Sequence, residues 1–389
     1  MSRLQVSQRV LDLPPYIFAK LEQMKSDYIM SHSDLIDLGV GDPDFQTQEN
    51  IVRMMKEQLD NPDNHRYPSF KGEKELREAI SRWYKTNYEV ELDPETEILV
   101  LIGSKEGLAH LPMAILNEGD YALVPDPAYP AYLSSIILAG GIPYFMPLTR
   151  GEKYFPIMED IPQGIASKAK LMFLNYPNNP TSVMADEASY AKAIRFAEKN
   201  GTVIAQDFAY SELAFDGLKP LSFLSVKGAK NVGVEFHSFS KTFAMTGWRL
   251  GFVVGNSEVL AALAKVKSCM DSGVFKAVQY AGIEGLTGPA DALEAMKKEY
   301  SVRRDLLAKG LNRLGWDFDN PGATFYFWVK VPEKYNMDSI RFAEYLLEKK
   351  GIMVTPGIGF GSMGEGYIRI AINLPSHQIE EVLKRLETL

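Results

Sequence analysis

The sequence predicts an α/β protein with a mostly parallel central sheet in a large domain and a smaller α+β domain after it. Short apolar runs alternate with amphipathic helical patterns between residues 97 and 255. Such alternation is typical of parallel strands joined by helices that cover both faces of a sheet. Near residue 290 the pattern changes to a long charged amphipathic segment and then to an alternating strand, which is typical of an antiparallel sheet.

Seven apolar runs are the strands expected in the large domain: 97–103, 121–127, 141–148, 170–177, 202–207, 232–240 and 249–255. A helical pattern follows the first run, although Pro112 interrupts it. Another helical pattern precedes Gly201, and glycine is a common helix stop. No repeat, low-complexity tract or flexible linker separates these elements.

The C-terminal region contains the elements expected of the smaller domain. They are amphipathic helices and two strands, at 290–316, 324–331, 341–351, 367–373 and 379–389. We therefore expect three parts: an N-terminal arm that joins the small domain (1–45), a large domain (46–289) and a small domain (290–389).

Composition argues against several classes of function. The 389 residues are 46% apolar and 24% charged, with a formal net charge of −8, which argues against a broad nucleic-acid surface. The apolar stretches are too short to span a bilayer and the N-terminus lacks a signal-peptide pattern, so we expect no membrane segment. The five histidines lack metal-ligand spacing, so we expect no metal. Cys269 is the one cysteine, which fits a reducing, cytoplasmic setting.

Polar residues that end the apolar runs form the candidate site, because ligands bind beyond the carboxyl ends of parallel strands. The segment 237–252 places Lys241 near Ser238, Ser240 and Arg249. A lysine in a desolvated, cation-rich site is easily deprotonated and can form a Schiff base with a carbonyl. Arg249 offers a planar fork for two phosphate oxygens, to which the serine hydroxyls can also donate. Taken alone, Lys241 would be an ordinary surface lysine.

Two further strand ends suit an aromatic, nitrogen-containing cofactor. Asp207 ends an apolar strand, where a carboxylate is costly unless it has a partner such as a pyridinium nitrogen. Tyr210 follows three residues later, and Asn179 stands in the turn NNPT; both side chains can reach a phenolic oxygen. Each alone is as typical of a helix cap, a core tyrosine or an ordinary Asn-Pro turn.

Four more positions complete the candidate site. Ser104 and Lys105 stand at a strand-to-helix junction, where backbone N–H groups attract phosphate, although Gly-Ser before a helix is also simple capping. Tyr129 can stack on a planar ring or be a core aromatic. Arg369 lies inside an apolar strand, where a cation needs a partner. That partner is either a substrate carboxylate or a structural acid.

The motifs NNPT, DFAYSE and SFSKTFAMTGWRLGF follow one another in this order, and they strongly resemble the class I/II aminotransferases of pyridoxal-phosphate (PLP) fold type I. The resemblance covers essentially the whole chain, from LGVGDPDF at 38–45 to YIRIAI at 367–372. Within that group, stretches such as NHRYPSFKGEKELREAI and VPDPAYPAY are most similar to the LL-diaminopimelate aminotransferases, which implies a place in lysine biosynthesis.

The resemblance implies how PLP is held and how the reaction proceeds. Lys241 carries PLP as a covalent aldimine and shuttles the substrate proton. Asp207 pairs with the ring nitrogen, and Tyr210 acts with Asn179 on the phenolic oxygen. Tyr129 stacks on the ring. The phosphate ligands are Ser104, Lys105, Ser238, Ser240 and Arg249.

The resemblance also implies the substrates and the assembly. An amino acid and a 2-oxo acid, such as 2-oxoglutarate, are the expected substrates. Arg369 binds the α-carboxylate, Gly41 approaches the substrate with its backbone, and Asn179 and Tyr129 contact it. Tyr16 lines the entrance. A homodimer is expected, in which Tyr67 reaches the phosphate of the neighbouring subunit.

One position departs from the family pattern, because Ser182 replaces the usual glycine after NPT. Glycine most easily takes a positive φ, so different backbone angles are expected in that turn.

Other functions remain open at this stage. The chain could be an aminotransferase for alanine, aspartate or an aromatic amino acid. A PLP-dependent carbon–sulfur lyase on the same fold would release pyruvate from cystathionine without an amino acceptor. The effector module of a transcription regulator is a third possibility, but it needs an attached DNA-binding domain, for which the chain has no room and no basic segment.

Overall fold

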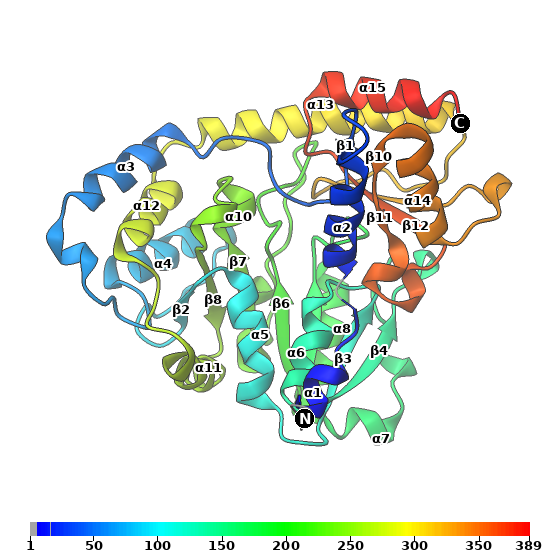
Figure 1. Ribbon diagram of the computed structural model, residues 1–389. Coiled ribbons are helices and arrows are strands. Elements are labelled where there is room, and N and C mark those ends of the chain that lie inside the picture. Colours follow the sequence, from blue (N-terminus) through cyan, green and yellow to red (C-terminus); the bar gives the residue numbers. More distant parts are fainter. Residues whose placement is uncertain (1–5, 16) are drawn as a thin grey trace, which may run out of the picture.

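A seven-stranded sheet lies at the centre of the computed structural model, which describes residues 6–15 and 17–389 (Figure 1). In spatial order its strands are β2 (Ile98–Leu101), β8 (Gly251–Gly255), β7 (Gly233–Ser238), β6 (Val203–Asp207), β5 (Ala169–Asn175), β3 (Tyr121–Asp126) and β4 (Ile142–Pro147). Neighbouring strands are parallel except at β8, which runs antiparallel to both β2 and β7. All seven expected strands are present, and the predicted fold class is confirmed.

Helices cover both faces of this sheet because its strands are apolar on both sides. Alternate residues of β2 show the division: Val100 packs into one hydrophobic cluster and Leu101 into another. The first cluster includes side chains from α4 (Lys74–Tyr88), α8 (Glu187–Asn200) and α12 (Lys276–Thr287). The second includes side chains from α5 (Ser104–Ile115), α6 (Ala131–Leu138) and α11 (Ser257–Met270). The central sheet is therefore buried on both sides.

A second, antiparallel sheet of three strands lies toward the C-terminus. Its order is β11 (Thr355–Pro356), β12 (Tyr367–Ala371) and β9 (Tyr326–Lys330). It packs in one core with α13 (Asp291–Arg313), α14 (Ser339–Lys350) and α15 (Ser376–Leu386). That core also takes in Tyr210 and Leu213, which follow β6. The domain boundaries at residues 45 and 289 stay a prediction.

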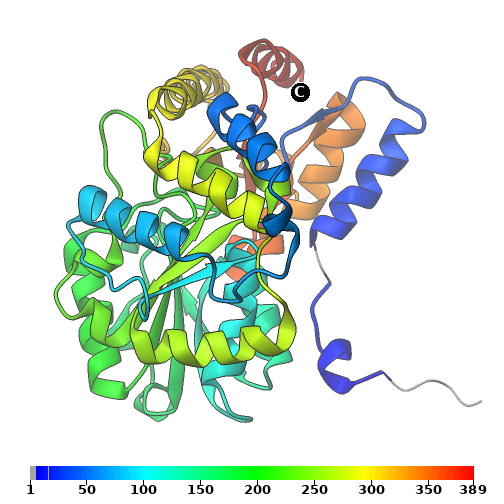
Figure 2. The ribbon, with the colours of Figure 1, turned by 90° about the vertical axis from the view of Figure 1, so that its left-hand side faces the viewer.

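The N-terminal segment contacts this C-terminal region. The strand β1 (Ile36–Asp37) pairs in parallel with β10 (Ile352–Met353). The helix α2 (Ile17–Ile29) lies beside α14 (Figure 2), where Leu21 and Leu347 share a small apolar cluster. The short helix α1 (Gln8–Leu11) precedes it and leaves Leu11 exposed. Within residues 6–15 and 17–389, no helix is long and apolar enough to cross a membrane.

Candidate active site

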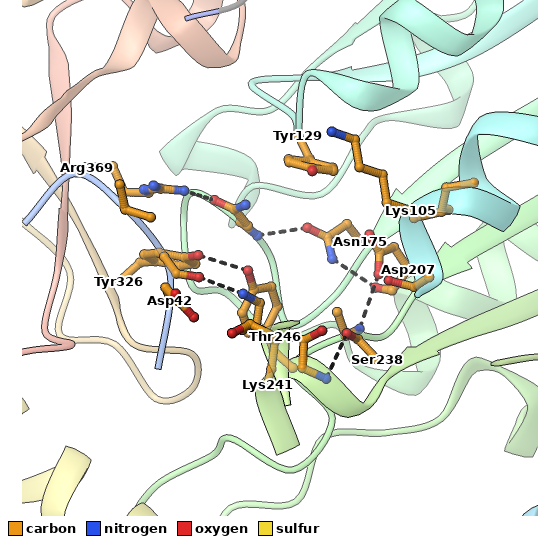
Figure 3. A pocket seen from close by; sticks show the side chains of 18 of the residues that line it. Asp42, Lys105, Tyr129, Asn175, Asp207, Ser238, Lys241, Thr246, Tyr326 and Arg369 are labelled. Carbon is orange, nitrogen blue, oxygen red and sulfur yellow. Dashed lines mark hydrogen bonds between the residues drawn. The ribbon is translucent and has the colours of Figure 1, made fainter. Parts of the chain in front are cut away.

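A cavity of about 440 Å³ lies where the carboxyl ends of β5, β6 and β7 face the small sheet (Figure 3). Twelve of the residues proposed from the sequence line it: Gly41, Ser104, Lys105, Tyr129, Asn179, Asp207, Tyr210, Ser238, Ser240, Lys241, Arg249 and Arg369. These residues come from segments spread over more than 300 positions of the chain. The fold therefore brings the predicted groups into one pocket.

Lys241 lies on α10 (Phe239–Thr242), a single helical turn that begins directly after β7. Its Nζ donates to the carbonyl oxygen of Gly41 at 2.6 Å. Burial lowers the pKa of Lys241 from its usual value to about 8, and the charges of Arg369 and Arg249 act in the same direction. The carboxylates of Asp42 and Asp207 partly oppose this fall. Near neutral pH a minor fraction of Lys241, far larger than for an ordinary lysine, is thus neutral and able to act as a nucleophile or base.

Asp207 is the last residue of β6, and its carboxylate is buried. The hydroxyl of Tyr132 donates to Oδ2 at 2.7 Å, and the Ala209 amide donates to Oδ1 at 3.2 Å. Burial raises the pKa of Asp207 to about 6, while these two bonds and the nearby His237 hold it down. A cationic group in the pocket would stabilise the ionised form further.

Two asparagines connect β5 to the substrate side of the pocket. Asn175, at the end of β5, donates from Nδ2 to the backbone oxygen of Asp207 at 2.8 Å. Its Oδ1 accepts from the backbone amide of Asn179 at 2.8 Å. Asn179 Oδ1 in turn accepts from Nη1 of Arg369 at 2.8 Å. The side chain of Asn179 is therefore held between the two sheets.

Two tyrosine hydroxyls meet on the small-sheet side. The hydroxyl oxygens of Tyr210 and Tyr326 lie 2.9 Å apart, and burial raises the pKa of Tyr210 well above its usual range. Tyr326 belongs to β9, and its ring lies 4.2 Å from the guanidinium carbon of Arg369. Tyr210 is therefore a neutral donor that a ligand could engage.

An anion-binding corner is built where the first turn of α5 meets Arg249. Ser104 begins α5, so its backbone N–H groups point toward the pocket with the positive end of the helix dipole. Gly103 has a φ of +78°, and any Cβ there would collide with the guanidinium of Arg249. Ser238 caps α10 by accepting from the Ser240 amide at 3.3 Å. These groups together suit a phosphate.

Arg369 is buried in β12 and faces the loop that precedes α3 (Glu49–Leu59). Its Nη2 donates to the carbonyl oxygen of Gly39 at 2.7 Å. Asn373 fixes the same loop, because its Nδ2 donates to the carbonyl oxygens of Val40 and Asp42 at 2.7 and 2.8 Å. A Cβ at Gly41 would collide with the hydroxyl of Tyr326, so glycine is required for this close approach.

Among the described residues proposed from the sequence, Tyr67 does not line this pocket. Tyr67 lies on the surface with an exposed fraction of 87%, so it does not contribute to the site of its own chain. Tyr16 lies outside the described residues.

The prediction of different backbone angles at Ser182 was wrong, because its φ is +65°, in the left-handed region that glycine favours. Its Oγ bonds Thr324 Oγ1 at 2.7 Å and the carbonyl oxygen of Tyr326 at 2.8 Å. These bonds compensate for the positive φ that a non-glycine residue disfavours.

Several residues that line the pocket were not predicted, among them Asn175, Thr246 and Tyr326. Tyr132, which donates to Asp207 without lining the pocket, was not predicted either. The sequence carried a weak signal for Asn175, which ends an apolar run as Asp207 does. It carried none for the two tyrosines, because Tyr132 lies 75 positions from Asp207 and Tyr326 lies 116 positions from Tyr210.

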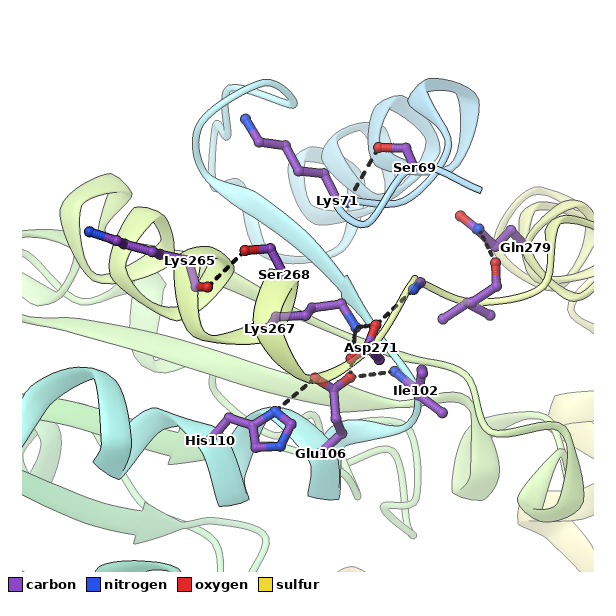
Figure 4. Close-up of polar contacts among 12 residues, drawn as sticks. Ser69, Lys71, Ile102, Glu106, His110, Lys265, Lys267, Ser268, Asp271 and Gln279 are labelled. Carbon is purple, nitrogen blue, oxygen red and sulfur yellow. Dashed lines mark hydrogen bonds and ion pairs between the residues drawn. The ribbon is translucent and has the colours of Figure 1, made fainter. Parts of the chain in front are cut away.

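A buried ion cluster lies between the start of α5 and the C-terminal end of α11 (Figure 4). Lys267 of α11 is fully buried, and its Nζ lies 3.0 Å from Glu106 Oε2 and 2.8 Å from Asp271 Oδ1. Glu106 also accepts from the Ile102 amide at 2.7 Å, just before the first turn of α5. Asp271 accepts from the Gly273 amide at 2.7 Å. The cluster therefore fixes the start of α5 against the loop that follows α11.

These features fit PLP. The buried Asp207 carboxylate faces the pocket, the neutralisable Lys241 stands beside it, and the start of α5 with Arg249 offers a place for phosphate. Among the described residues, no group of three His, Cys, Asp or Glu side chains is arranged to hold a metal ion. The fold and the site together define a PLP-dependent enzyme of fold type I.

Comparison with known proteins places this enzyme in a family. The family described as aminotransferase class I and II matches residues 33–386, so the chain belongs to it and uses PLP as its cofactor. The LL-diaminopimelate aminotransferase of Halothermothrix orenii is 50% identical over 384 residues, which cover 99% of this chain and 98% of that protein. The enzyme of the same name from Aquifex aeolicus is 46% identical and covers 99% of both chains.

A solved structure shows the same likeness. Substrate-bound BacF from Bacillus subtilis is 40% identical to this chain and superposes with a TM-score of 0.95. The match covers 99% of this chain and 98% of that one. This chain and that protein therefore share one fold over nearly their whole length.

Proposed function

We propose that this protein is an LL-diaminopimelate:2-oxoglutarate aminotransferase that acts in lysine biosynthesis. Near-full-length relatives at 50% and 46% identity carry the name LL-diaminopimelate aminotransferase. The observation that carries the transamination chemistry is the meeting of Lys241, Asp207 and Arg369 in one cavity.

Each residue has a distinct task in this proposal. Bound PLP supplies an aldehyde that takes up the amino group and a protonated ring that accepts electrons from the substrate carbon. The Asp207 carboxylate keeps the ring nitrogen protonated, and Tyr132 holds that carboxylate in place. Lys241 binds the cofactor and moves the proton between the substrate carbon and the cofactor carbon. Tyr210 and Asn179 donate to the phenolic oxygen.

The phosphate and the substrate carboxylate have separate cationic sites. Arg249 binds the phosphate with Ser104, Lys105, Ser238 and Ser240, while Tyr129 stacks on the ring. Arg369 binds the α-carboxylate in place of its present acceptors, Asn179 Oδ1 and the Gly39 carbonyl. A carboxylate is the stronger acceptor, because a charged partner roughly doubles the strength of such a bond.

The active unit in this proposal is a cytoplasmic homodimer. Tyr67 is exposed on its own chain, and nearby Phe70 and Phe275 are 38% and 37% exposed. A second copy would cover these aromatic side chains and receive the Tyr67 hydroxyl at its phosphate. The single cysteine fits the reducing cytoplasm.

One assay tests the function against its alternatives. Purified holoenzyme is offered LL-diaminopimelate, meso-diaminopimelate, alanine, aspartate or cystathionine, each with and without 2-oxoglutarate. Glutamate formed from the LL isomer, and from the other amino acids at much lower rates, supports the proposal. Preference for alanine or aspartate makes the protein a different aminotransferase. Pyruvate released from cystathionine without an acceptor makes it a lyase.

A further inference from the structure

The pocket extends beyond the groups that hold the cofactor. Its far end reaches α2 and the strand pair β1–β10, where it is lined by Leu21, Glu22, Lys25, Asp37, Val40 and Met353. Three of these six residues are charged, and neither the cofactor nor the α-carboxylate uses them. Charged side chains at the end of a binding pocket point to a charged end on the ligand.

The charged side chains at this end of the pocket contact one another. Lys25 Nζ and Asp37 Oδ2 form an ion pair at 2.9 Å, with 41% and 18% of the side chains exposed. Asp37 Oδ1 also accepts from the Gly39 amide at 2.9 Å, which fixes the carboxylate. Glu22 lies one helical turn before Lys25 and adds a second carboxylate beside it. A partly exposed pair of this kind is weak, so a ligand can open it at little cost.

This charged end lies within reach of the α-carboxylate site. Gly39 connects the two, because its carbonyl oxygen accepts from Arg369 Nη2 at 2.7 Å while its backbone amide donates to Asp37 Oδ1 at 2.9 Å. Standard bond lengths then place the Asp37 carboxylate at most about 9 Å from the Arg369 guanidinium. The two carboxyl carbons of an extended seven-carbon diamino acid lie roughly 7–8 Å apart. Such a substrate, bound through one carboxylate at Arg369, spans the gap.

We propose that Lys25, Asp37 and Glu22 form a subsite for the distal ammonium and carboxylate of a long zwitterionic amino acid. This inference rests on the proposed function. Lys25 binds the distal carboxylate, and Asp37 with Glu22 binds the distal ammonium. The ion pair between Lys25 and Asp37 is thereby replaced by two ion pairs with the substrate. An amino acid with an apolar side chain would disrupt the pair without replacing its bonds, which disfavours it.

The test compares Lys25→Met and Asp37→Asn with Lys20→Met as the matched control. Lys20 is also on α2 and also pairs with an acid, Glu344 at 3.4 Å, but it does not line the pocket. Asparagine at 37 keeps an oxygen for the Gly39 amide. For each PLP-loaded variant, kcat/KM is measured with LL- and meso-diaminopimelate, and thermal unfolding reports the fold.

Loss of one charged contact is expected to lower kcat/KM for the LL isomer by about ten- to a hundredfold in Lys25→Met and Asp37→Asn. The preference for LL over meso, which differ only at the distal carbon, should shrink at the same time, and Lys20→Met should match the wild type. A general structural defect would instead lower kcat/KM equally for the LL and meso isomers and leave the preference for LL unchanged.

Two results would overturn the subsite: LL activity within twofold of the wild type in both variants, or equal losses for both isomers. If the wild type itself fails to convert LL-diaminopimelate, the proposed function fails and the subsite with it. The wild-type measurement therefore separates the two failures.

Discussion

The charge of Lys241 is controlled by groups on both sides of the pocket. Burial, together with the charges of Arg369 and Arg249, lowers its pKa to about 8, and the charge of Asp42 opposes this fall. Only the neutral amine can attack an aldehyde. Covalent uptake of PLP by the apoenzyme should therefore accelerate as pH rises through about 8.

Asp42→Asn should move this pH profile to lower pH, because the variant loses the charge that raises the pKa of Lys241. The shift is checked by measuring, between about pH 6 and 9, how fast the visible absorbance of the bound cofactor appears. Lys241→Ala is the control and should show neither that absorbance nor turnover. An upward shift in Asp42→Asn would contradict the assigned electrostatics.

Tyr132→Phe should lower kcat/KM by roughly ten- to a hundredfold, since a hydrogen bond to a charged group contributes about 1.5–3 kcal/mol. The change removes the donor that holds Asp207 Oδ2, so the carboxylate should bind the ring nitrogen less well and PLP should dissociate more readily. Tyr190→Phe is a matched control, because Tyr190 is buried in the other large-domain cluster and, unlike Tyr132, is not the residue that donates to Asp207. Equal effects in the two variants would assign Tyr132 a packing role only.

Among the residues of the site, those that could be predicted are the ones whose neighbours in the sequence form a recognisable pattern. Asp207 ends an apolar strand and Lys241 follows one within three residues, and these positions predict a pocket. Tyr132 and Tyr326 lie within apolar surroundings and look like core aromatics. Their hydroxyls acquire a partner only when distant segments fold together, so local pattern could not reveal them.

At the scale of elements, the strands were predictable and their order was not. Each apolar run became a strand because its side chains are buried on both faces. Nothing in the run at 249–255 indicates that β8 inserts between β2 and β7 in the antiparallel direction. That insertion places Arg249, just before β8, against Gly103.

The helix pair α5–α11 depends on the buried lysine between them. Lys267→Met should lower the free energy of unfolding by about 3 kcal/mol or more, because it leaves Glu106 and Asp271 without their cation. Lys265→Met, on an exposed position of the same helix, should change stability by no more than about 0.5 kcal/mol. Chemical denaturation of the three proteins measures the difference. Similar midpoints would show that the cluster contributes little.

At the scale of the whole molecule, one chain brings together almost all of the site but leaves Tyr67 exposed. In a two-fold symmetric dimer the same surface of both subunits forms the interface. If Tyr67 lies in that interface, the Tyr67 side chain of each subunit can contact the active site of the other subunit. A subunit with Lys241→Ala and one with Tyr67→Phe would then pair to give one intact site, built from the second subunit's Lys241 and the first subunit's Tyr67.

Co-expression of these two defective chains should thus restore about a quarter of wild-type activity, since random pairing makes half of the dimers mixed and each mixed dimer has one intact site. Each variant alone should remain well below that level. If Tyr67 served its own chain, no mixed dimer would hold an intact site, and the mixture would show only the average of the two variants. Activity per mole of dimer, measured with tagged chains so that the mixed species can be isolated, decides between these outcomes.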